Sequence, residues 1–335
     1  MSQLSSQSRK RIGWLDVSRG MAFMMVIYSH LPMCDSKVMN FFAPIFLTTF
    51  FFVSGYLFKS GSSFGRVFEQ RTRTLFIPFV VLGFIMILMG QMLSFNEHVD
   101  FMDAVKGLLL QNGQNQILWF IAALYVYSLI FYWVDRWSGS LKRLMWIASG
   151  LFVINCIASY WLNVKHLPWH IVESGYACFY MALGKFYRSY EDEIDRQARG
   201  WKLMTALVVY IAYISLTNLY IGHGGSKMIV DSMVITTLGL MLIIYVSKKF
   251  FNNSRFLLFV GANTLFYFAF HGKVYSLILT LGHKAWPAYV AGQSFWTDLT
   301  IGFLVAFLDA LILIVPAMLV NKYTPQILGK NFKLW

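Results

Sequence analysis

Two ionisable residues, Arg19 and His30, stand eleven positions apart within the apolar run 14–33. In an α-helix, eleven residues turn through about 1100°, or three turns plus roughly 20°, so the two side chains share one face. They lie about 16 Å apart along the helix axis. Asp16 precedes Arg19 by one turn and can pair with it. One stripe therefore offers an ion pair at one end and an imidazole, a possible general base or nucleophile, further along.

A second histidine, His271, ends the run from Gly261 to His271 in a later apolar segment. Counted from the same side of the predicted helices, His271 stands about fifteen residues in and His30 about sixteen, so similar depths are expected. Simpler interpretations stay open for both residues. Asp16 and Arg19 can form an interfacial pair that fixes a helix end, and a lone histidine can hydrogen-bond a neighbouring helix.

Further polar residues lie in or beside the apolar runs. Asp309 falls near the middle of one run and Asp231 near the start of another. Either carboxylate can be a charge partner for a histidine or a proton-relay group in a transporter. A connection between two runs carries three more candidates, His166, His170 and Glu173, which can hold a polar acceptor or simply be solvated.

The composition shows which environment must hold these residues. The chain is 58% hydrophobic and only 13% charged, with a mean hydropathy of +0.57, whereas soluble domains average about 25% charged residues. Lipid is therefore the expected solvent. The net charge of +13 comes from short basic stretches between apolar runs, which indicates membrane topology rather than nucleic-acid binding. The three cysteines include no CxxC pair, so we expect neither a disulfide framework nor a metal site.

A membrane-spanning helix needs about 20 mainly apolar residues. The sequence predicts an all-α polytopic membrane protein with about ten spans, and a single membrane-embedded domain over 1–335. That domain divides into a cytoplasmic tail at 1–13, a transmembrane bundle at 14–320 and a second cytoplasmic tail at 321–335. The first span is expected to stay uncleaved, because no small-residue cleavage site follows it. The predicted spans are 14–33, 40–58, 75–94, 116–134, 142–162, 171–188, 202–221, 228–247, 256–278 and 299–320.

The distribution of lysine and arginine predicts the orientation of these spans. Cytoplasmic loops collect positive residues. With the N-terminus inside, every inner segment of the ten-span arrangement holds at least three Lys or Arg, and no outer segment holds more than two. This alternation favours ten spans with both termini in the cytoplasm.

Several motifs, in this order, resemble those of the acyltransferase family 3 membrane proteins. The hallmark of that family is a basic residue, ten further residues and a histidine, as Arg19 and His30 stand here. The form of the second-span motif, with no appended esterase-like domain, is similar to the fucose 4-O-acetylase-like branch. Members of the family often carry two arginines before the third span. Gln70 stands at the position of the first of them, so this chain departs from the family pattern there. The other matching stretches are Arg11 to Gly20, Phe51 to Phe58, Arg73 to Pro78, Leu118 to Phe120 and Gly261 to His271.

This resemblance implies an O-acetyltransferase of the bacterial inner membrane. Its donor would be cytoplasmic acetyl-CoA, and its acceptor a glycan of the cell envelope or a lipid-linked saccharide precursor. Arginines 19, 71 and 73 are then expected to bind the donor phosphates, since Arg pairs with phosphate bidentately. Ser54 and Tyr56 can add hydrogen bonds. The expected catalytic residues are His30, acting as general base or as acetyl carrier, with Arg19, Asp16 and His271.

Two other classes of protein fit part of the pattern. A multi-span transporter or a flippase for lipid-linked glycans explains the spans and the two buried aspartates. Transporters often contain internal repeats, and none is visible here. A purely structural membrane subunit leaves the stripe of Arg19 and His30 without a purpose. The acetyltransferase interpretation requires no metal and no nucleic acid, and it allows a homo-oligomer.

Overall fold

The protein is described by a computed structural model covering residues 12–93, 100–111, 118–164, 167–222, 224–287, 291–292 and 294–330. Within these ranges the chain is helical, and its one β-bridge joins Gly222 to Gly225. The predicted all-α class is therefore confirmed. The outermost parts of the predicted tails, 1–11 and 331–335, lie outside the described residues.

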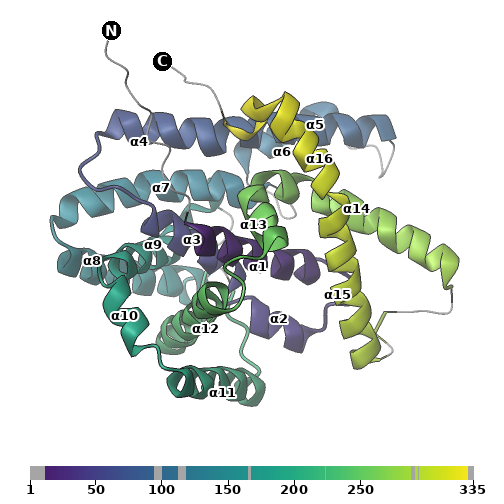
Figure 1. Cartoon of the computed structure of the whole chain (residues 1–335). Helices are drawn as coiled ribbons and strands as arrows, with labels where there is room; N and C mark the ends of the chain where they lie inside the picture. The colour runs from purple at the N-terminus through teal and green to yellow at the C-terminus, as the bar shows by residue number, and fades with distance from the viewer. Residues whose placement is uncertain are drawn as a thin grey trace, which may run out of the picture.

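Sixteen α-helices form in the described residues, with short π- and 3₁₀-helical turns between some of them (Figure 1). The α-helices are α1 (Gly13–Ser29), α2 (Ser36–Phe42), α3 (Phe46–Tyr56), α4 (Phe64–Arg71), α5 (Ile77–Leu93), α6 (Phe101–Leu110), α7 (Trp119–Ser138), α8 (Leu141–Cys156), α9 (Ser174–Ser189), α10 (Glu191–Gln197), α11 (Gly200–Thr217), α12 (Ile229–Lys249), α13 (Arg255–Ala262), α14 (Thr264–Ala285), α15 (Phe295–Ile312) and α16 (Ile314–Tyr323). The π turns are Thr72–Phe76 and Ile157–Trp161, and the 3₁₀ turns are Pro168–Glu173 and Pro325–Leu328.

Seven helical stretches of the described chain are long and apolar enough to cross a membrane. They indicate a multi-pass membrane protein, as predicted, while the count of ten stays a prediction. The three predicted spans outside this set correspond to α1, α7 and α9, and α1 and α9 have only 17 and 16 residues. The seven are Ser36–Tyr56, Phe64–Met92, Leu141–Trp161, Gly200–Thr217, Ile229–Lys249, Thr264–Ala285 and Phe295–Tyr323.

The helices α1 and α9 lie inside the bundle, surrounded by other helices. Helix α1 packs against α13, α3, α12 and α15, and α9 packs against α3, α8 and α7. A helix whose neighbours are protein needs less hydrophobic surface than one that faces lipid. This position accounts for the shorter lengths of both helices and for the polar residues that α1 carries.

Glycines let the backbones of the central helices touch. A Cβ added at Gly20 of α1 would overlap the carbonyl oxygen of Leu257, and one at Gly261 of α13 would overlap that of Asp16. Helices α3 and α9 meet in the same way, since a Cβ at Gly55 would overlap the carbonyl of Met181. Small residues at such crossings are the usual means of close helix packing in membranes. They fix α1, which carries both Arg19 and His30, against α13.

We therefore expect Gly261→Ala to destabilise the protein, although alanine is the better helix former. The added methyl group would force α1 and α13 apart at Asp16, at a cost of about 1–3 kcal/mol. Thermal unfolding of the purified protein in detergent should show a lower midpoint. The matched control is Gly272→Ala in α14, where the nearest atom to an added Cβ is 3.9 Å away. Equal midpoints for the two variants would contradict the proposed close contact.

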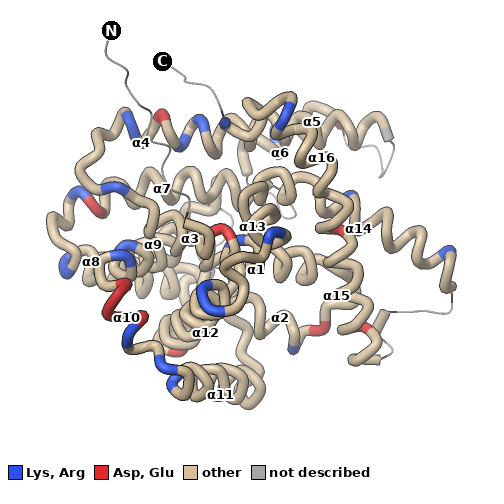
Figure 2. The backbone as a smooth tube through the Cα atoms, in the orientation of Figure 1, with Lys and Arg blue, Asp and Glu red and all other residues tan. Residues whose placement is uncertain are grey.

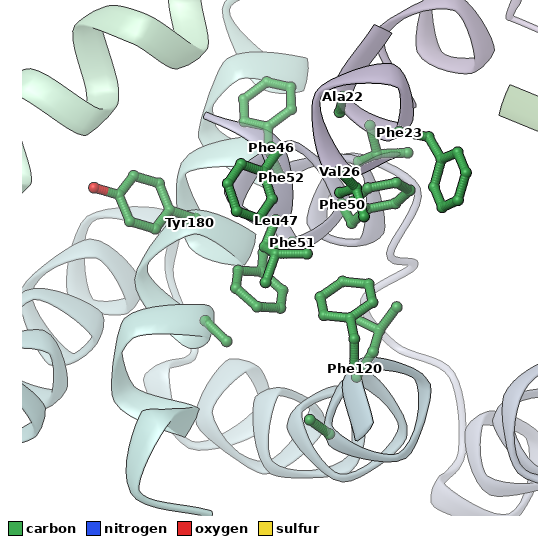
Figure 3. Close-up of a cluster of buried hydrophobic side chains, with 14 of the residues drawn as sticks. Ala22, Phe23, Val26, Phe46, Leu47, Phe50, Phe51, Phe52, Phe120 and Tyr180 are labelled. Carbon is green, nitrogen blue, oxygen red and sulfur yellow. The ribbon is translucent and has the colours of Figure 1, made fainter. Parts of the chain in front are cut away.

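Aromatic side chains fill the centre where α1, α3 and α7 meet (Figure 3). The ring of Phe50 lies 5.4 Å from that of Phe120 and 5.6 Å from that of Phe268. Phe23 of α1 packs edge-on against Phe268 at 4.8 Å. These edge-to-face and offset contacts hold the rings in defined positions. Through Phe268 the aromatic centre also reaches α14, so it joins α1, α3 and α7 to a fourth helix.

The charged residues are unevenly distributed over the bundle. Figure 2 shows lysine and arginine along α4, at the junction of α7 and α8, and around α10. The acidic residues of α10 lie in the same region. This end of the bundle holds the segments that the sequence assigns to the cytoplasm.

Candidate functional site

The structure brings the two predicted histidines together. The ring centroids of His30 and His271 lie 5.3 Å apart, and the planes are nearly perpendicular at 77°. His30 caps the C-terminal end of α1, whereas His271 lies inside α14. His271 is 4% exposed and packs against the edge of Phe23 at 5.5 Å. The expected similarity in depth therefore corresponds to an actual contact.

Helix α1 ends earlier than the predicted span, and this changes the setting of His30. The predicted span runs to residue 33, but the helix ends at Ser29, three residues before Pro32. The proline ring clashes sterically with the residue before it, which makes the α-helical conformation of that residue unfavourable. As a result His30 is exposed at the helix end rather than enclosed within the helix run. An exposed imidazole can reach a substrate without any rearrangement of the bundle.

Both imidazoles are oriented by hydrogen bonds to their own helices. The Nδ1 atom of His30 lies 2.7 Å from the carbonyl oxygen of Val26, and that of His271 lies 2.9 Å from the carbonyl of Tyr267. A carbonyl can only accept, so Nδ1 carries the proton in each ring. The lone pair of a neutral ring is then on Nε2. This is the form that a general base or an imidazole nucleophile needs.

Asp16 and Arg19 form the predicted ion pair at the start of α1. The Asp16 carboxylate is buried, while the Arg19 side chain is 28% exposed. Asp16 thus holds the guanidinium of Arg19, and Arg19 also lines a cavity. The pair fixes the position of a cation that a ligand can reach.

That cavity has a volume of about 470 Å³ and a strongly basic wall. The described residues that line it include no aspartate or glutamate. One part of its wall is apolar, where the rings of Phe50, Phe120 and Phe268 contact one another. Such a cavity suits a long molecule with an anionic end and a less polar end. The cations in its wall are Arg19, Lys59, Arg66, Arg71 and Lys330.

A thin aromatic layer lies between the cavity and the two histidines. Phe268 lines the cavity and stacks on Phe120 at 5.2 Å. Phe268 precedes His271 by one helical turn, and Phe23 contacts both of these residues. A reactive group at the apolar part of the cavity wall therefore lies on the other side of this layer from the imidazoles.

The predicted donor-binding residues divide into two groups. Arg19, Arg71 and Ser54 line the cavity, whereas Arg73 and Tyr56 are not among its lining residues. The backbone of Arg73 packs against Gly329, at which an added Cβ would overlap the Arg73 carbonyl. Ser54 and Tyr56 are two residues apart on α3, so they point to different sides of the helix.

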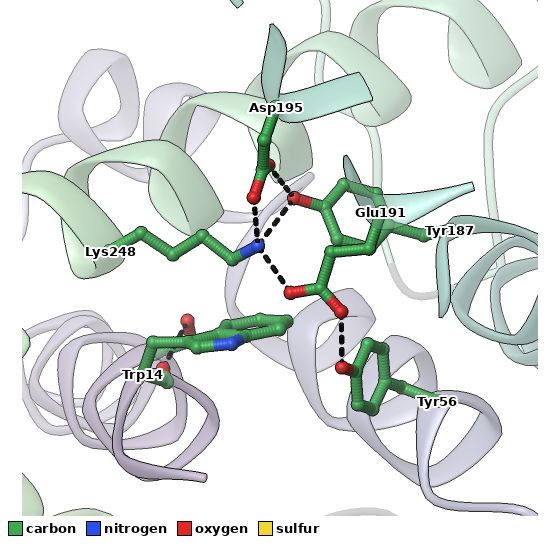
Figure 4. Close-up of polar contacts among 7 residues, drawn as sticks. Trp14, Tyr56, Tyr187, Glu191, Asp195 and Lys248 are labelled. Carbon is green, nitrogen blue, oxygen red and sulfur yellow. Dashed lines mark hydrogen bonds and ion pairs between the residues drawn. The ribbon is translucent and has the colours of Figure 1, made fainter. Parts of the chain in front are cut away.

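The hydroxyl of Tyr56 donates a hydrogen bond to Glu191 in a polar cluster outside the cavity (Figure 4). Lys248 of α12 is the centre of this cluster, pairing with Glu191 and, at 2.8 Å, with Asp195. Its ammonium group also lies 4.5 Å from the ring centroid of Trp14. A cation that contacts carboxylates and rings from several helices holds those helices together. Here it joins α1, α3, α10 and α12.

Sequence reasoning missed the contribution of the C-terminal segment. Lys330 was counted only as a topology charge, yet it lines the cavity. Its Nζ donates to Oδ1 of Asn321 at 2.6 Å and to Oδ1 of Asn263 at 3.4 Å. Asn321 is 9 residues and Asn263 is 67 residues from Lys330 in the sequence, so no local pattern could have revealed this arrangement.

Arg66 is a second residue that sequence reasoning missed, and it bears on the departure at Gln70. Both residues lie on α4, four positions apart, and both line the cavity. Residues at this spacing share a helix face. Arg66 therefore places a guanidinium one turn before the position at which related sequences often carry arginine.

The remaining polar candidates lie in separate places. His170 packs on the ring of Trp119 at 4.5 Å and lies 3.8 Å from a carboxylate oxygen of Glu173, while His166 is outside the described residues. Asp309 is fully buried, and neither carboxylate oxygen has a hydrogen-bond partner among the described residues. Asp231 stands in the first turn of α12.

Cys34, in the loop after His30, is an unsuitable nucleophile. Burial, with the charge of Asp35 beside it, raises the pKa of the Cys34 thiol to about 11. At neutral pH this thiol is protonated, and only the thiolate is a strong nucleophile. The Cys34 thiol therefore does not compete with the imidazoles as a nucleophile.

Comparison with protein families gives one match. The model of a family described as an acyltransferase domain matches residues 12–315. This range includes α1 to α15, and hence Arg19, His30 and His271. Neither the curated proteins nor the solved structures that were compared with the chain match it.

Proposed function

We propose, from the premise that this chain belongs to the acyltransferase 3 family, that it moves an acetyl group from acetyl-CoA to a sugar hydroxyl. Because it belongs to this family, the chain is an acyltransferase. Its seven long apolar helical stretches indicate a multi-pass membrane protein. The donor, the acceptor and the place of action are the proposal. The acceptor is a cell-envelope glycan or its lipid-linked precursor, in the inner membrane of a bacterium. The form of this chain's second-span motif is similar to that of the fucose 4-O-acetylase-like branch.

The observation that carries this proposal is the basic cavity that ends in an apolar aromatic layer beside two histidines. Coenzyme A has phosphates at its nucleotide end and a thioester at the end of a long, uncharged arm. The arginines and lysines of the wall match the phosphates. The apolar part of the wall, at Phe50, Phe120 and Phe268, accepts the arm and points the thioester toward His271 and His30.

The proposed reaction uses the lone pair on Nε2 of His30. This atom takes the proton of the sugar hydroxyl while the hydroxyl oxygen bonds to the thioester carbonyl carbon. The carbon–sulfur bond then breaks, and the leaving thiolate receives the proton from the imidazolium. His271 stands 5.3 Å away, close enough to exchange the proton through one water molecule. In the covalent alternative, Nε2 of His30 carries the acetyl group before the hydroxyl takes it.

The ten-span arrangement, with both termini in the cytoplasm, belongs to this proposal. Its support is that the basic cavity is built from segments rich in lysine and arginine, where a cytoplasmic donor would bind. In this arrangement α1 and α14 both run outward, so His30 and His271 lie toward the outer side. The acceptor then approaches from the side opposite to the donor.

Donor dependence tests the proposal most directly. Membranes that contain the protein are supplied with acetyl-CoA labelled in the acetyl group, and label in the envelope glycans is measured against membranes without the protein. An acetyltransferase incorporates label in proportion to the amount of protein. A transporter or flippase, whose proton relay Asp309 would suit, incorporates none.

Lys330 provides a second prediction. Its ammonium lies in the donor cavity and is held by two asparagines. We expect Lys330→Ala to raise the KM for acetyl-CoA by roughly tenfold with little change in kcat, because a phosphate contact is made equally in the ground and transition states. Initial rates at varied acetyl-CoA will show this. Lys322→Ala is the matched control, since Lys322 does not line the cavity. An unchanged KM for acetyl-CoA in the Lys330 variant would show that Lys330 does not contribute to donor binding.

A further inference from the structure

A second cavity, of about 310 Å³, adjoins the basic one. It lies between the loop that follows α3 and the loop that joins α7 to α8. The two cavities have Phe58, Lys59 and Ser62 in common, so a ligand can extend from one into the other.

The lining of this second cavity suits a phosphate group. Asp135 is its one acidic lining residue among those described, and it is already paired with Lys185. The excess positive charge therefore comes from Lys59 and Arg136. Serine hydroxyls line the same cavity and can donate hydrogen bonds to phosphate oxygens, except that of Ser138, which donates to the backbone carbonyl of Asp135. The serines are Ser60, Ser62, Ser138 and Ser140.

Two glycines shape the loops around this lining. Gly61 and Gly139 have φ angles of +79° and +64°, a conformation that side chains disfavour. They allow each loop to turn tightly and to expose its serines and backbone toward the cavity. Lysines and arginines that only set membrane topology need neither a cavity nor a ring of hydroxyl groups.

The order of the chemical groups in coenzyme A matches the order of the two cavities. From the thioester, the molecule continues through the uncharged arm to a pyrophosphate and then to a ribose with a separate 3′-phosphate. From the histidines, the protein offers the aromatic layer, the basic wall, the shared Lys59 and then the second cavity. Coenzyme A thus runs from an uncharged end to two successive anionic groups, and the protein runs from an aromatic layer to two successive cationic sites.

We infer that the second cavity binds the 3′-phosphate of the donor, with Arg136 as its main partner. This inference rests on the proposed function, because it takes acetyl-CoA as the donor. A guanidinium pairs with a phosphate monoester through two parallel hydrogen bonds. Arg136 thereby selects coenzyme A over otherwise identical molecules that lack this phosphate.

The test compares acetyl-CoA with acetyl-dephospho-CoA, which lacks only the 3′-phosphate. The wild type should prefer acetyl-CoA by on the order of tenfold in kcat/KM, as expected for a charged hydrogen-bonded contact. In Arg136→Gln the ratio between the two donors should fall close to one. Arg136→Lys should give an intermediate ratio, because it keeps the charge and loses the bidentate geometry. Arg143→Gln, in α8 and outside the cavity lining, should retain the wild-type ratio.

The outcomes separate the inference from the proposed function. Equal use of the two donors by the wild type overturns the inference and leaves the acetyltransferase intact. The inference is also overturned, with the acetyltransferase intact, if Arg136→Gln keeps the wild-type ratio of kcat/KM between the two donors. A wild type that transfers acetyl from neither donor overturns the proposed function and the inference with it. Inhibition of the wild type by adenosine 3′,5′-bisphosphate should also be stronger than by adenosine 5′-monophosphate, and equal inhibition contradicts the site without any variant.

Discussion

Replacing His30 by alanine should lower acetyl transfer by about 10² to 10⁴, the range that a positioned general base contributes. The variant loses the only exposed imidazole of the histidine pair, while His271 stays buried behind Phe23. Because His30 lies after the last residue of α1, its removal takes away no packing within the helix. The KM for acetyl-CoA should hardly change, since the donor phosphates bind at the other end of α1. The measurement is labelled acetyl transfer at matched protein levels.

His283→Ala serves as the control, because this histidine is exposed near the end of α14 and far along the helix from His271. Both variants should insert into membranes and unfold at wild-type temperatures. Full activity in the His30 variant would move the chemistry elsewhere, with His271 as the next candidate. Quenched reactions separate the two mechanisms, since an acetyl group trapped on His30 would show the covalent route.

The sequence predicted how far along the helices the two histidines lie better than it predicted which helices are neighbours. Counting residues from the inner ends gave His30 and His271 similar depths, and their rings lie 5.3 Å apart. The count to His30 runs along one helix with a rise of about 1.5 Å per residue, whereas the predicted span 256–278 is divided at Asn263 into α13 and α14. Which helix lies beside which depends on packing between distant segments. The contact of α1 with α13, at Gly20 and Gly261, could only be anticipated as a close approach to an unknown neighbour.

The direction of individual side chains was harder to predict. Ser54 and Tyr56 belong to the same motif, yet one lines the cavity and the other binds Glu191. A buried helix such as α3 is apolar on every side, so its sequence carries no periodicity that would tell the faces apart. Lys330 was missed for another reason: its position depends on the return of the chain end to α13. Hydropathy cannot show that return.

Removing Arg19 should affect both stability and donor binding, and the two effects can be separated. In Arg19→Gln the buried Asp16 carboxylate loses the cation that pairs with it. Breaking a fully buried pair costs about 3–5 kcal/mol, and because Arg19 is partly exposed we expect about 2 kcal/mol here. The guanidinium also leaves the donor cavity, so the KM for acetyl-CoA should rise by roughly tenfold.

The double variant Asp16→Asn with Arg19→Gln separates these effects. Neutralising Asp16 removes the uncompensated charge, so the unfolding temperature in detergent should return most of the way to that of the wild type. The KM should stay raised, because no guanidinium has been restored to the cavity.

If the double variant recovered both the stability and the KM, Arg19 would be only a structural partner of Asp16. If it recovered neither, the ion pair would contribute more than charge balance, through the contact of Asp16 with Gly261 that sets α1 against α13. Recovery of stability alone is the result that makes Arg19 a binding residue held in place by Asp16.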